Sequence, residues 1–116
     1  MEVIVIDDEA RLSRLISDLF NSDGIKSQWF ADSRKGLEAI LKLKPRLVIS
    51  DIKMPFLDGL ALMKQVHSKL DIPFVFYSGE SPYPEQFLLN AGAKRLFQKP
   101  HDLHEIFSYA RSILEK

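Results

Sequence analysis

The stretch E-V-I-V-I-D-D-E, residues 2–9, together with L-V-I-S-D-I-K-M-P, residues 47–55, decides the fold. Each begins as a short run of apolar, mostly β-branched residues and then reaches acids, Asp7 and Asp8 in the first and Asp51 in the second. Runs of this kind are typical of strands buried on both faces of a parallel sheet. The carboxyl ends of such strands carry the ligand sites of open α/β folds. We therefore expect the three carboxylates to converge in a pocket that requires a cation, because neighbouring like charges repel.

Strand-like and helix-like segments alternate along the whole chain. The expected strands cover residues 2–6, 26–30, 47–50, 74–77 and 95–98, and the expected helices cover 9–22, 34–43 and three segments that begin near Asp58, Pro84 and Asp102. Strict alternation predicts a parallel sheet with helices on both faces. If Asp7, Asp8 and Asp51 share a site, the first and third strands are neighbours, which favours the strand order 2-1-3-4-5. The expected fold class is α/β, a flavodoxin-like (βα)5 doubly wound five-stranded parallel sheet.

Several residues are expected to define the helix ends and faces. Ser33 and Asp58 can cap the second and third helices, and Pro84 is expected to be the first residue of the fourth. Asp102, with Glu105 three residues later, resembles a capping box for the last helix. The first helix is expected to face the core with apolar residues at helical spacing, namely Leu12, Leu15, Ile16, Leu19 and Phe20.

Composition limits the functional classes. A chain of 116 residues is the size of one domain, here residues 1–116, and its 46% hydrophobic content supports a core. Sixteen basic and sixteen acidic residues cancel, so no charge field favours nucleic acid or a membrane surface. The chain has no cysteine, no apolar run long enough to span a membrane and no signal-peptide pattern. A cytoplasmic location is the expectation.

Two further polar sites follow the fourth and fifth strands. Ser78 and Gly79 come after the fourth, and Lys99 and Pro100 after the fifth. The strand ends thus supply carboxylates, a hydroxyl and an ammonium at one edge of the sheet. Magnesium prefers oxygen ligands, commonly one or two carboxylates completed by waters and phosphate oxygens. A lysine and a hydroxyl can bind the remaining oxygens, so the set suits a phosphoryl group.

These residues resemble the receiver domain of two-component response regulators. The resemblance covers the whole chain, and the motifs that carry it are Asp7-Asp8, Asp51, Met54-Pro55-x-x-Asp58-Gly59, Ser78-Gly79, Ala91-Gly92-Ala93 and Lys99-Pro100. Each motif alone is weak, but the ordered set is specific. The resemblance implies a signalling domain, not an enzyme beyond its own Mg²⁺-dependent phosphorylation and dephosphorylation.

The resemblance assigns a role to each site residue. It implies that Asp51 accepts a phosphoryl group, and that Asp7, Asp8, Asp51 and the backbone carbonyl of Lys53 hold Mg²⁺ or Mn²⁺.

Ser78, Gly79 and Lys99 would contact the phosphoryl oxygens, and the bond before Pro100 would be cis. Lys53 and Glu80 would border the path of attacking water and so modulate the lifetime of the phosphoryl group. Because their charges are opposite, we expect Lys53 and Glu80 to be able to pair across the pocket mouth.

The implied partners are a sensor histidine kinase or a histidine phosphotransfer protein, and a downstream protein or output domain that responds to a conformational switch. Direct binding to nucleic acid or membrane is not implied.

Three other classes of protein fit the sequence less well. Phosphatases of the haloacid-dehalogenase type need Asp-x-Asp after a strand, but Asp51 is followed by Ile52 and Lys53. The glycine motifs of Rossmann and P-loop nucleotide binders are missing. A degenerate receiver, serving only to bind protein, would usually lack the acceptor, the acids or the lysine.

One departure from the receiver pattern is Leu96. Receivers usually have an aromatic residue at this position, and its ring moves together with the switch hydroxyl, here that of Ser78. Phe97 beside it is expected to face the opposite way.

Overall fold

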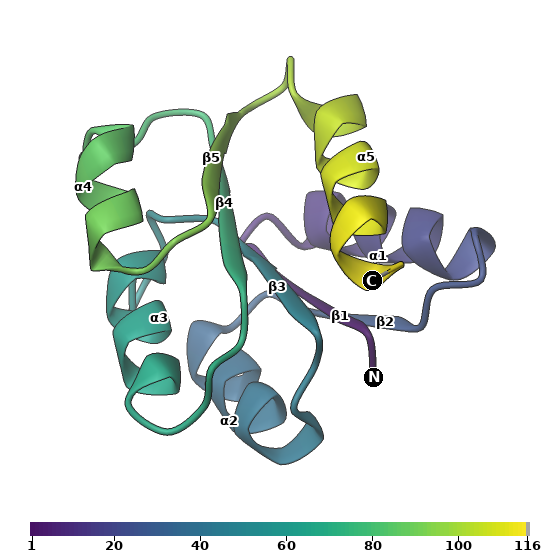
Figure 1. The fold of residues 1–116 in the computed structure, drawn as a ribbon, viewed down its shortest axis with the longest axis horizontal. Coiled ribbons are helices and arrows are strands. Elements are labelled where there is room, and N and C mark those ends of the chain that lie inside the picture. The colour runs from purple at the N-terminus through teal and green to yellow at the C-terminus, as the bar shows by residue number, and fades with distance from the viewer. Residues whose placement is uncertain (116) are drawn as a thin grey trace.

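The computed structural model describes residues 1–115, and within them five parallel strands alternate with five helices (Figure 1). The strands are β1 (Val3–Ile6), β2 (Ser27–Phe30), β3 (Leu47–Ser50), β4 (Phe74–Ser78) and β5 (Arg95–Gln98). The helices are α1 (Ala10–Ser22), α2 (Ser33–Leu43), α3 (Gly59–His67), α4 (Glu85–Ala91) and α5 (Leu103–Leu114). The strand order is β2-β1-β3-β4-β5, so the predicted flavodoxin-like topology is confirmed. Lys116, the last residue of the expected domain, lies outside the described residues.

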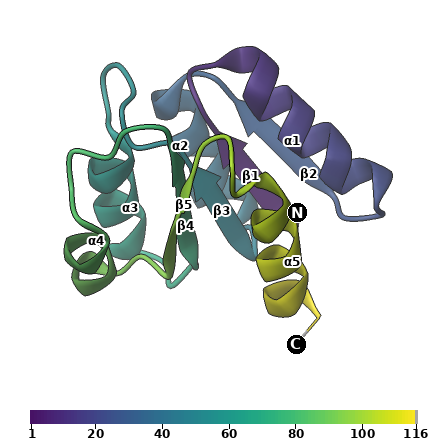
Figure 2. The same cartoon turned by 90° about the horizontal axis from the view of Figure 1, so that it is seen from above.

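The sheet separates two layers of helices, with α1 and α5 on one face and α2, α3 and α4 on the other (Figure 2). Alternation along β1 divides its side chains between two buried clusters: Ile4 and Ile6 face the α2–α3–α4 layer, and Val3 and Val5 face the α1–α5 layer. All four are essentially inaccessible to solvent. The sequence of β1 is therefore apolar at every position, because helices cover both faces of this strand.

The first helix buries less of its apolar surface than its spacing predicts. Ile16 and Phe20 are buried, but Leu15 and Leu19 are 48% and 41% exposed, so including them in the core was wrong. Five apolar residues over nine positions cover a wider arc than one sheet face can bury.

Three predicted helix ends also need correction. Asp32, not Ser33, caps α2 by accepting a hydrogen bond from the Arg34 N–H, while the buried Ser33 hydroxyl donates to the Pro55 carbonyl. Pro84 is the residue before α4 and not its first residue. At α5 the Asp102 carboxylate accepts from the Gln98 N–H and makes no bond to the helix, so the capping box is wrong.

The predicted cap at α3 is present. Asp58 Oδ1 accepts from the Ala61 N–H at 2.8 Å.

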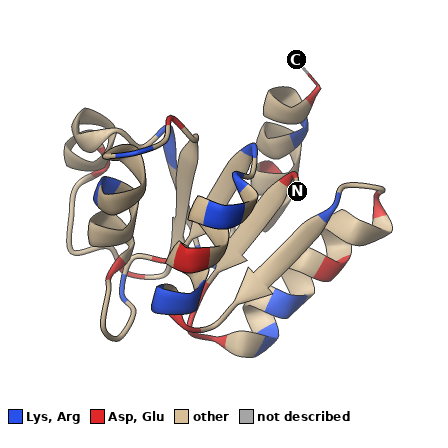
Figure 3. Cartoon of the chain, turned by 90° about the horizontal axis from the view of Figure 1, so that it is seen from below, with Lys and Arg blue, Asp and Glu red and all other residues tan. Residues whose placement is uncertain are grey.

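Basic and acidic residues are interspersed over the ribbon, in keeping with a balanced net charge (Figure 3).

Candidate functional site

The register of the central strands brings the first and third acid sites together. Ile6 of β1 pairs with Ser50 of β3, so the next residues, Asp7 and Asp51, leave the sheet at the same level. The Asp51 N–H donates to the Ile6 carbonyl at 2.8 Å, which extends the ladder to the acid. Asp7 and Asp51 are buried, whereas Asp8 is exposed. Carboxylate oxygens of all three lie within 4.8 Å of one another.

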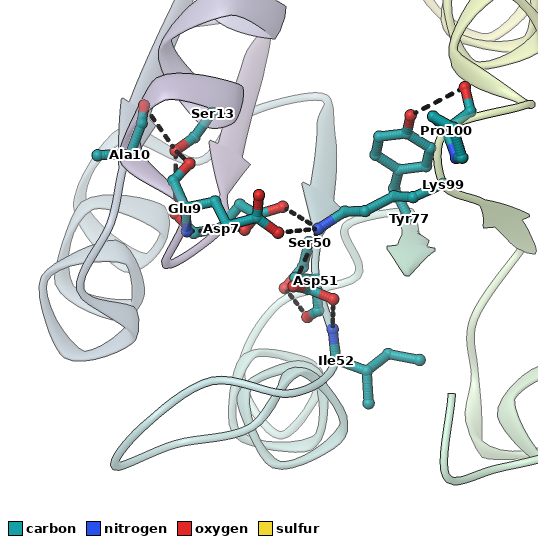
Figure 4. A network of polar contacts seen from close by, with 10 residues as sticks. All are labelled: Asp7, Glu9, Ala10, Ser13, Ser50, Asp51, Ile52, Tyr77, Lys99 and Pro100. Carbon is teal, nitrogen blue, oxygen red and sulfur yellow. Dashed lines mark hydrogen bonds and ion pairs between the residues drawn. The ribbon is translucent and has the colours of Figure 1, made fainter. Parts of the chain in front are cut away.

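Lys99 reaches from the end of β5 into this acidic group (Figure 4). Its Nζ lies 2.7 Å from Asp7 Oδ2, 3.1 Å from Asp51 Oδ2 and 3.3 Å from Glu9 Oε1. The other carboxylate oxygens accept backbone bonds, Asp7 Oδ1 from the Glu9 N–H at 3.0 Å and Asp51 Oδ1 from the Ile52 N–H at 2.7 Å. Each buried carboxylate is therefore bound at both oxygens, which fixes its orientation.

Burial and charge act against each other in this network. Burial raises the pKa of Asp7 to about 6, and the hydrogen bonds from Lys99 and the Glu9 N–H only partly offset that rise. For Lys99, burial alone would lower the pKa, but the contacts with Asp7 and Asp51 outweigh it and hold the pKa above its ordinary value. One ammonium does not fully compensate two buried carboxylates and a nearby third acid.

Close packing of the start of α3 against the backbone of Asp51 and Ile52 fixes the position of Asp51. The Gly59 N–H donates to the Ile52 carbonyl at 2.7 Å, and a Cβ at Gly59 would lie 2.2 Å from the Asp51 carbonyl oxygen. Only glycine can therefore stand at the start of α3. This is the physical role of the Asp58-Gly59 pair in the sequence motif.

The remaining predicted residues surround an open pocket above the acids. It is lined by Asp8, Glu9, Asp51, Lys53, Ser78, Gly79, Glu80 and Lys99. Ser78 is buried at the end of β4, and the Lys99–Pro100 peptide bond is cis. Lys53 and Glu80 are both exposed, but within residues 1–115 no ion pair joins them, so the idea of a paired pocket mouth is wrong in this structure. Both side chains extend into solvent, where pairing adds little.

Sequence reasoning missed three residues that support the site. Glu9 contributes a third carboxylate to Lys99. Ser13 is buried on α1 and donates its hydroxyl to the Asp7 carbonyl at 2.9 Å, which anchors the β1–α1 turn. The hydroxyl of Tyr77 reaches the Pro100 carbonyl at 3.5 Å, while burial raises its pKa. A serine inside the apolar face of a helix was the one signal available beforehand, for Ser13.

The donor set fits a hard divalent cation. Three carboxylates converge, and Asp8 among them is exposed and outside the reach of Lys99 given above. Oxygen donors with several open positions are what Mg²⁺ and Mn²⁺ accept, because such ions retain waters.

Comparison with known proteins identifies the family. A model described as the response regulator receiver domain matches residues 3–111. The chain belongs to the response regulator receiver domain family. The receiver domain is a signalling domain of two-component systems, as the motifs predicted.

The curated relatives of this receiver are longer proteins. It is 29% identical over 116 residues to the C4-dicarboxylate transport transcriptional regulatory protein DctD of Pseudomonas aeruginosa, a match covering 98% of this chain and 25% of that protein. It is 31% identical over 121 residues to a protein-glutamate methylesterase/protein-glutamine glutaminase of Methanococcoides burtonii, covering all of this chain and 34% of that protein. The chain thus spans about a quarter to a third of the length of these two relatives.

Solved receiver structures share the fold closely. The receiver domain of NtrX from Brucella abortus superimposes with a TM-score of 0.86 at 28% identity, with 99% of each chain covered. The Francisella response regulator 1452 receiver domain gives a TM-score of 0.89 at 23% identity, covering 98% and 96%, and supports the fold alone. Within residues 1–115, no helix combines the length and apolar character needed to cross a membrane.

Proposed function

We propose that this receiver accepts a phosphoryl group on Asp51 and uses it to control a partner or output domain. The observation that carries the proposal is the meeting of Asp51, two further carboxylates and the Lys99 ammonium at one sheet edge. Acids gathered in this way are costly for stability and are expected where function requires them. The family match makes phosphoacceptor signalling the expected use of such a site.

The transfer is a displacement at phosphorus. A carboxylate oxygen of Asp51 attacks the phosphorus of a phosphohistidine, the P–N bond breaks, and the imidazole leaves with the bonding electrons and takes up a proton. Dephosphorylation ends the signal: water attacks phosphorus, the P–O bond to Asp51 breaks, and inorganic phosphate is released. The donor is a sensor histidine kinase or a histidine phosphotransfer protein.

Lys99 and Ser78 are proposed to bind phosphoryl oxygens. The Lys99 ammonium already lies 3.1 Å from Asp51 Oδ2, so it can neutralise charge that develops there. Ser78 is the last residue of β4, and both it and Gly79 line the same pocket. Asp7, Asp8, Asp51 and the Lys53 carbonyl would hold Mg²⁺ or Mn²⁺, which when bound supplies positive charge to the transferring group.

Incubation with acetyl phosphate and Mg²⁺ tests the proposal. The parent protein is expected to gain the mass of one phosphoryl group, while Asp51→Asn gains none and EDTA prevents labelling of the parent. Asp71→Asn, an exposed acid in the loop before β4, is the matched control and should label normally. Labelling of Asp51→Asn, or steady phosphate release from varied esters without a phosphoprotein, would refute the assignment.

The lifetime of the phosphoryl group is proposed to depend on Lys53 and Glu80. Both side chains border the pocket without entering the buried acid group, so they can obstruct or orient a water. Lys53→Ala is expected to accelerate loss of phosphate from phospho-Asp51 in excess Mg²⁺, with a smaller effect for Glu80→Ala. Decay at the parent rate in both variants would contradict this role.

A further inference from the structure

The loop between β4 and α4, residues 79–84, lies between the acceptor pocket and α4. In receivers that resemble this one, an aromatic on the fifth strand moves with the switch hydroxyl, but here that residue is Leu96. Leu96 is half-buried and packs on the α2–α3–α4 side of the sheet. Phe97 is buried on the opposite side, against α1 and α5, so it cannot replace the aromatic. The expectation that Phe97 faces away is confirmed.

An aromatic residue of the loop, Tyr83, occupies the same layer as Leu96. Its ring packs against the α2–α3–α4 cluster and stacks on Phe87 of α4, with ring centroids 5.3 Å apart and planes 10° from parallel. Its hydroxyl donates to Asp58 Oδ2 at 3.4 Å. Ser81 fixes the backbone here, because its hydroxyl donates to the Tyr83 carbonyl at 2.6 Å and accepts from the Tyr83 N–H at 3.1 Å.

Asp58 connects this tyrosine to the acceptor. Its Oδ1 caps α3 at the Ala61 N–H, which leaves Oδ2 for Tyr83. The next residue, Gly59, packs directly on the backbone of Asp51. A continuous series of contacts therefore runs from Asp51 through the start of α3 to Tyr83 and then to Phe87 on α4. It does not pass through β5.

We propose that the Tyr83–Asp58 hydrogen bond is a latch that holds the β4–α4 loop and α4 in place, and that it opposes the inward movement of Ser78. The inference rests on the proposed function, in which Ser78 binds a phosphoryl oxygen, and adds that its hydroxyl turns inward to do so. Only four residues separate Ser78 from Tyr83, so a shift at one end of the loop pulls on the other. Tyr83 is a positioning residue in this scheme, since it does not touch the reacting atoms.

The bond has the strength that a reversible latch needs. The Asp58 carboxylate raises the pKa of Tyr83, so the hydroxyl remains a donor across the physiological range. The contact is long and partly exposed, so it belongs at the low end for a hydrogen bond to a charged acceptor. A bond of that strength biases a loop without locking it.

Tyr83→Phe tests the latch, with Tyr109→Phe on α5 as a control that also removes one phenolic hydroxyl. Without ligand, amide exchange in residues 79–91 is expected to be faster in Tyr83→Phe than in the parent and unchanged in Tyr109→Phe. With beryllium fluoride and Mg²⁺ as a phosphoryl mimic, Tyr83→Phe should bind about threefold more tightly, as expected for loss of one weak hydrogen bond. Parental exchange rates and parental affinity in Tyr83→Phe would overturn the inference.

A double-mutant cycle separates the latch from a packing effect. Ser can still cap α3 but is too short to reach the Tyr83 hydroxyl, so Asp58→Ser removes the acceptor of the latch and keeps the helix start. In that background Tyr83→Phe is expected to change neither exchange nor affinity. An undiminished effect of Tyr83→Phe there would overturn the latch. Failure of the parent to bind beryllium fluoride would instead refute the proposed function, and the exchange measurement without ligand would still decide whether the bond holds the loop.

Discussion

Two glycines beside the acceptor pocket differ in the room that surrounds them. A Cβ at Gly59, which begins α3, would lie 2.2 Å from the Asp51 carbonyl oxygen and 2.8 Å from Cε1 of Phe76. A Cβ at Gly79, which follows β4, would have the Lys99 Cβ as its nearest neighbour at 3.9 Å. The β3–α3 side of the pocket is therefore close-packed against backbone, whereas the β4–α4 side has ordinary clearance.

The difference corresponds to two tasks in a receiver. The proposed phosphoryl transfer would need the Asp51 carboxylate held in one orientation, and backbone contact at Gly59 and Ile52 restricts it. A switch needs a segment that can move at small energetic cost, and Gly79 is exposed with free space around it. The close-packed β3–α3 side and the more open β4–α4 side of the pocket meet where Tyr83 contacts Asp58.

The largest expected effect is from Gly59→Ala. The added methyl group would overlap backbone atoms that cannot move independently of Asp51, so we expect a loss of more than about 3 kcal/mol in the free energy of unfolding. Gly79→Ala meets no atom closer than 3.9 Å and has no left-handed backbone, so it should change stability by less than about 1 kcal/mol. Urea unfolding of both variants measures this. Equal losses would mean that the two sides do not differ.

Removing the positive charge of Lys99 should have the next largest effect. Lys99→Met leaves Asp7 and Asp51 buried and facing each other without their cation, which we expect to cost about 3 kcal/mol in EDTA. Mg²⁺ should restore part of the loss. Lys94→Met, at an exposed lysine before β5, is the control and should unfold like the parent. If Lys99→Met were as stable as the parent in EDTA, the ammonium would not hold the two acids together.

The central acids and the lysine could be predicted from sequence because each follows a recognisable buried strand. Parallel strands all end at the same edge, so Asp7, Asp51 and Lys99 converge whatever the loops do. The Tyr83–Asp58 contact could not be predicted, because it joins two loops separated by 25 residues and depends on the conformation of both. Sequence alone does not separate Ser33 from Asp32 as the cap of α2, because both residue types can cap a helix.

The pH dependence of stability should show the strain at Asp7. Below its ordinary pKa of 3.8 the carboxyl is protonated in both the folded and the unfolded chain, and as pH rises through about 6 the folded state must ionise a buried group. In EDTA, Asp7→Asn is therefore expected to match the parent near pH 4 and to exceed it above about pH 7, by up to about 3 kcal/mol. Thermal unfolding from acid to neutral pH measures the difference. An advantage that stayed constant with pH would exclude titration of Asp7 as its cause.

The smallest expected effects come from two residues with left-handed backbone, one on the β3–α3 side and one far from the pocket. Phe56 in the β3–α3 loop has φ of 69°, and Lys44 at the end of α2 has φ of 49°. Glycine adopts this region without the steric penalty of a side chain, so Lys44→Gly should raise stability by up to about 1 kcal/mol.

Phe56→Gly gains the same relief but loses the stacking of the Arg34 guanidinium on the ring. The guanidinium lies 3.7 Å from the ring centroid, and such a contact contributes about 0.5–1 kcal/mol at an exposed site. We therefore expect little net change at Phe56 and a measurable gain at Lys44. Phosphorylation rates should follow the parent for Lys44→Gly, because Lys44 precedes β3 whereas Asp51 follows it, and α2 contributes no residue to the pocket. A large gain in the free energy of unfolding for Phe56→Gly would mean that the left-handed backbone at Phe56 costs more than its contact with Arg34 contributes. The β3–α3 loop would then be under more strain than its close packing indicates.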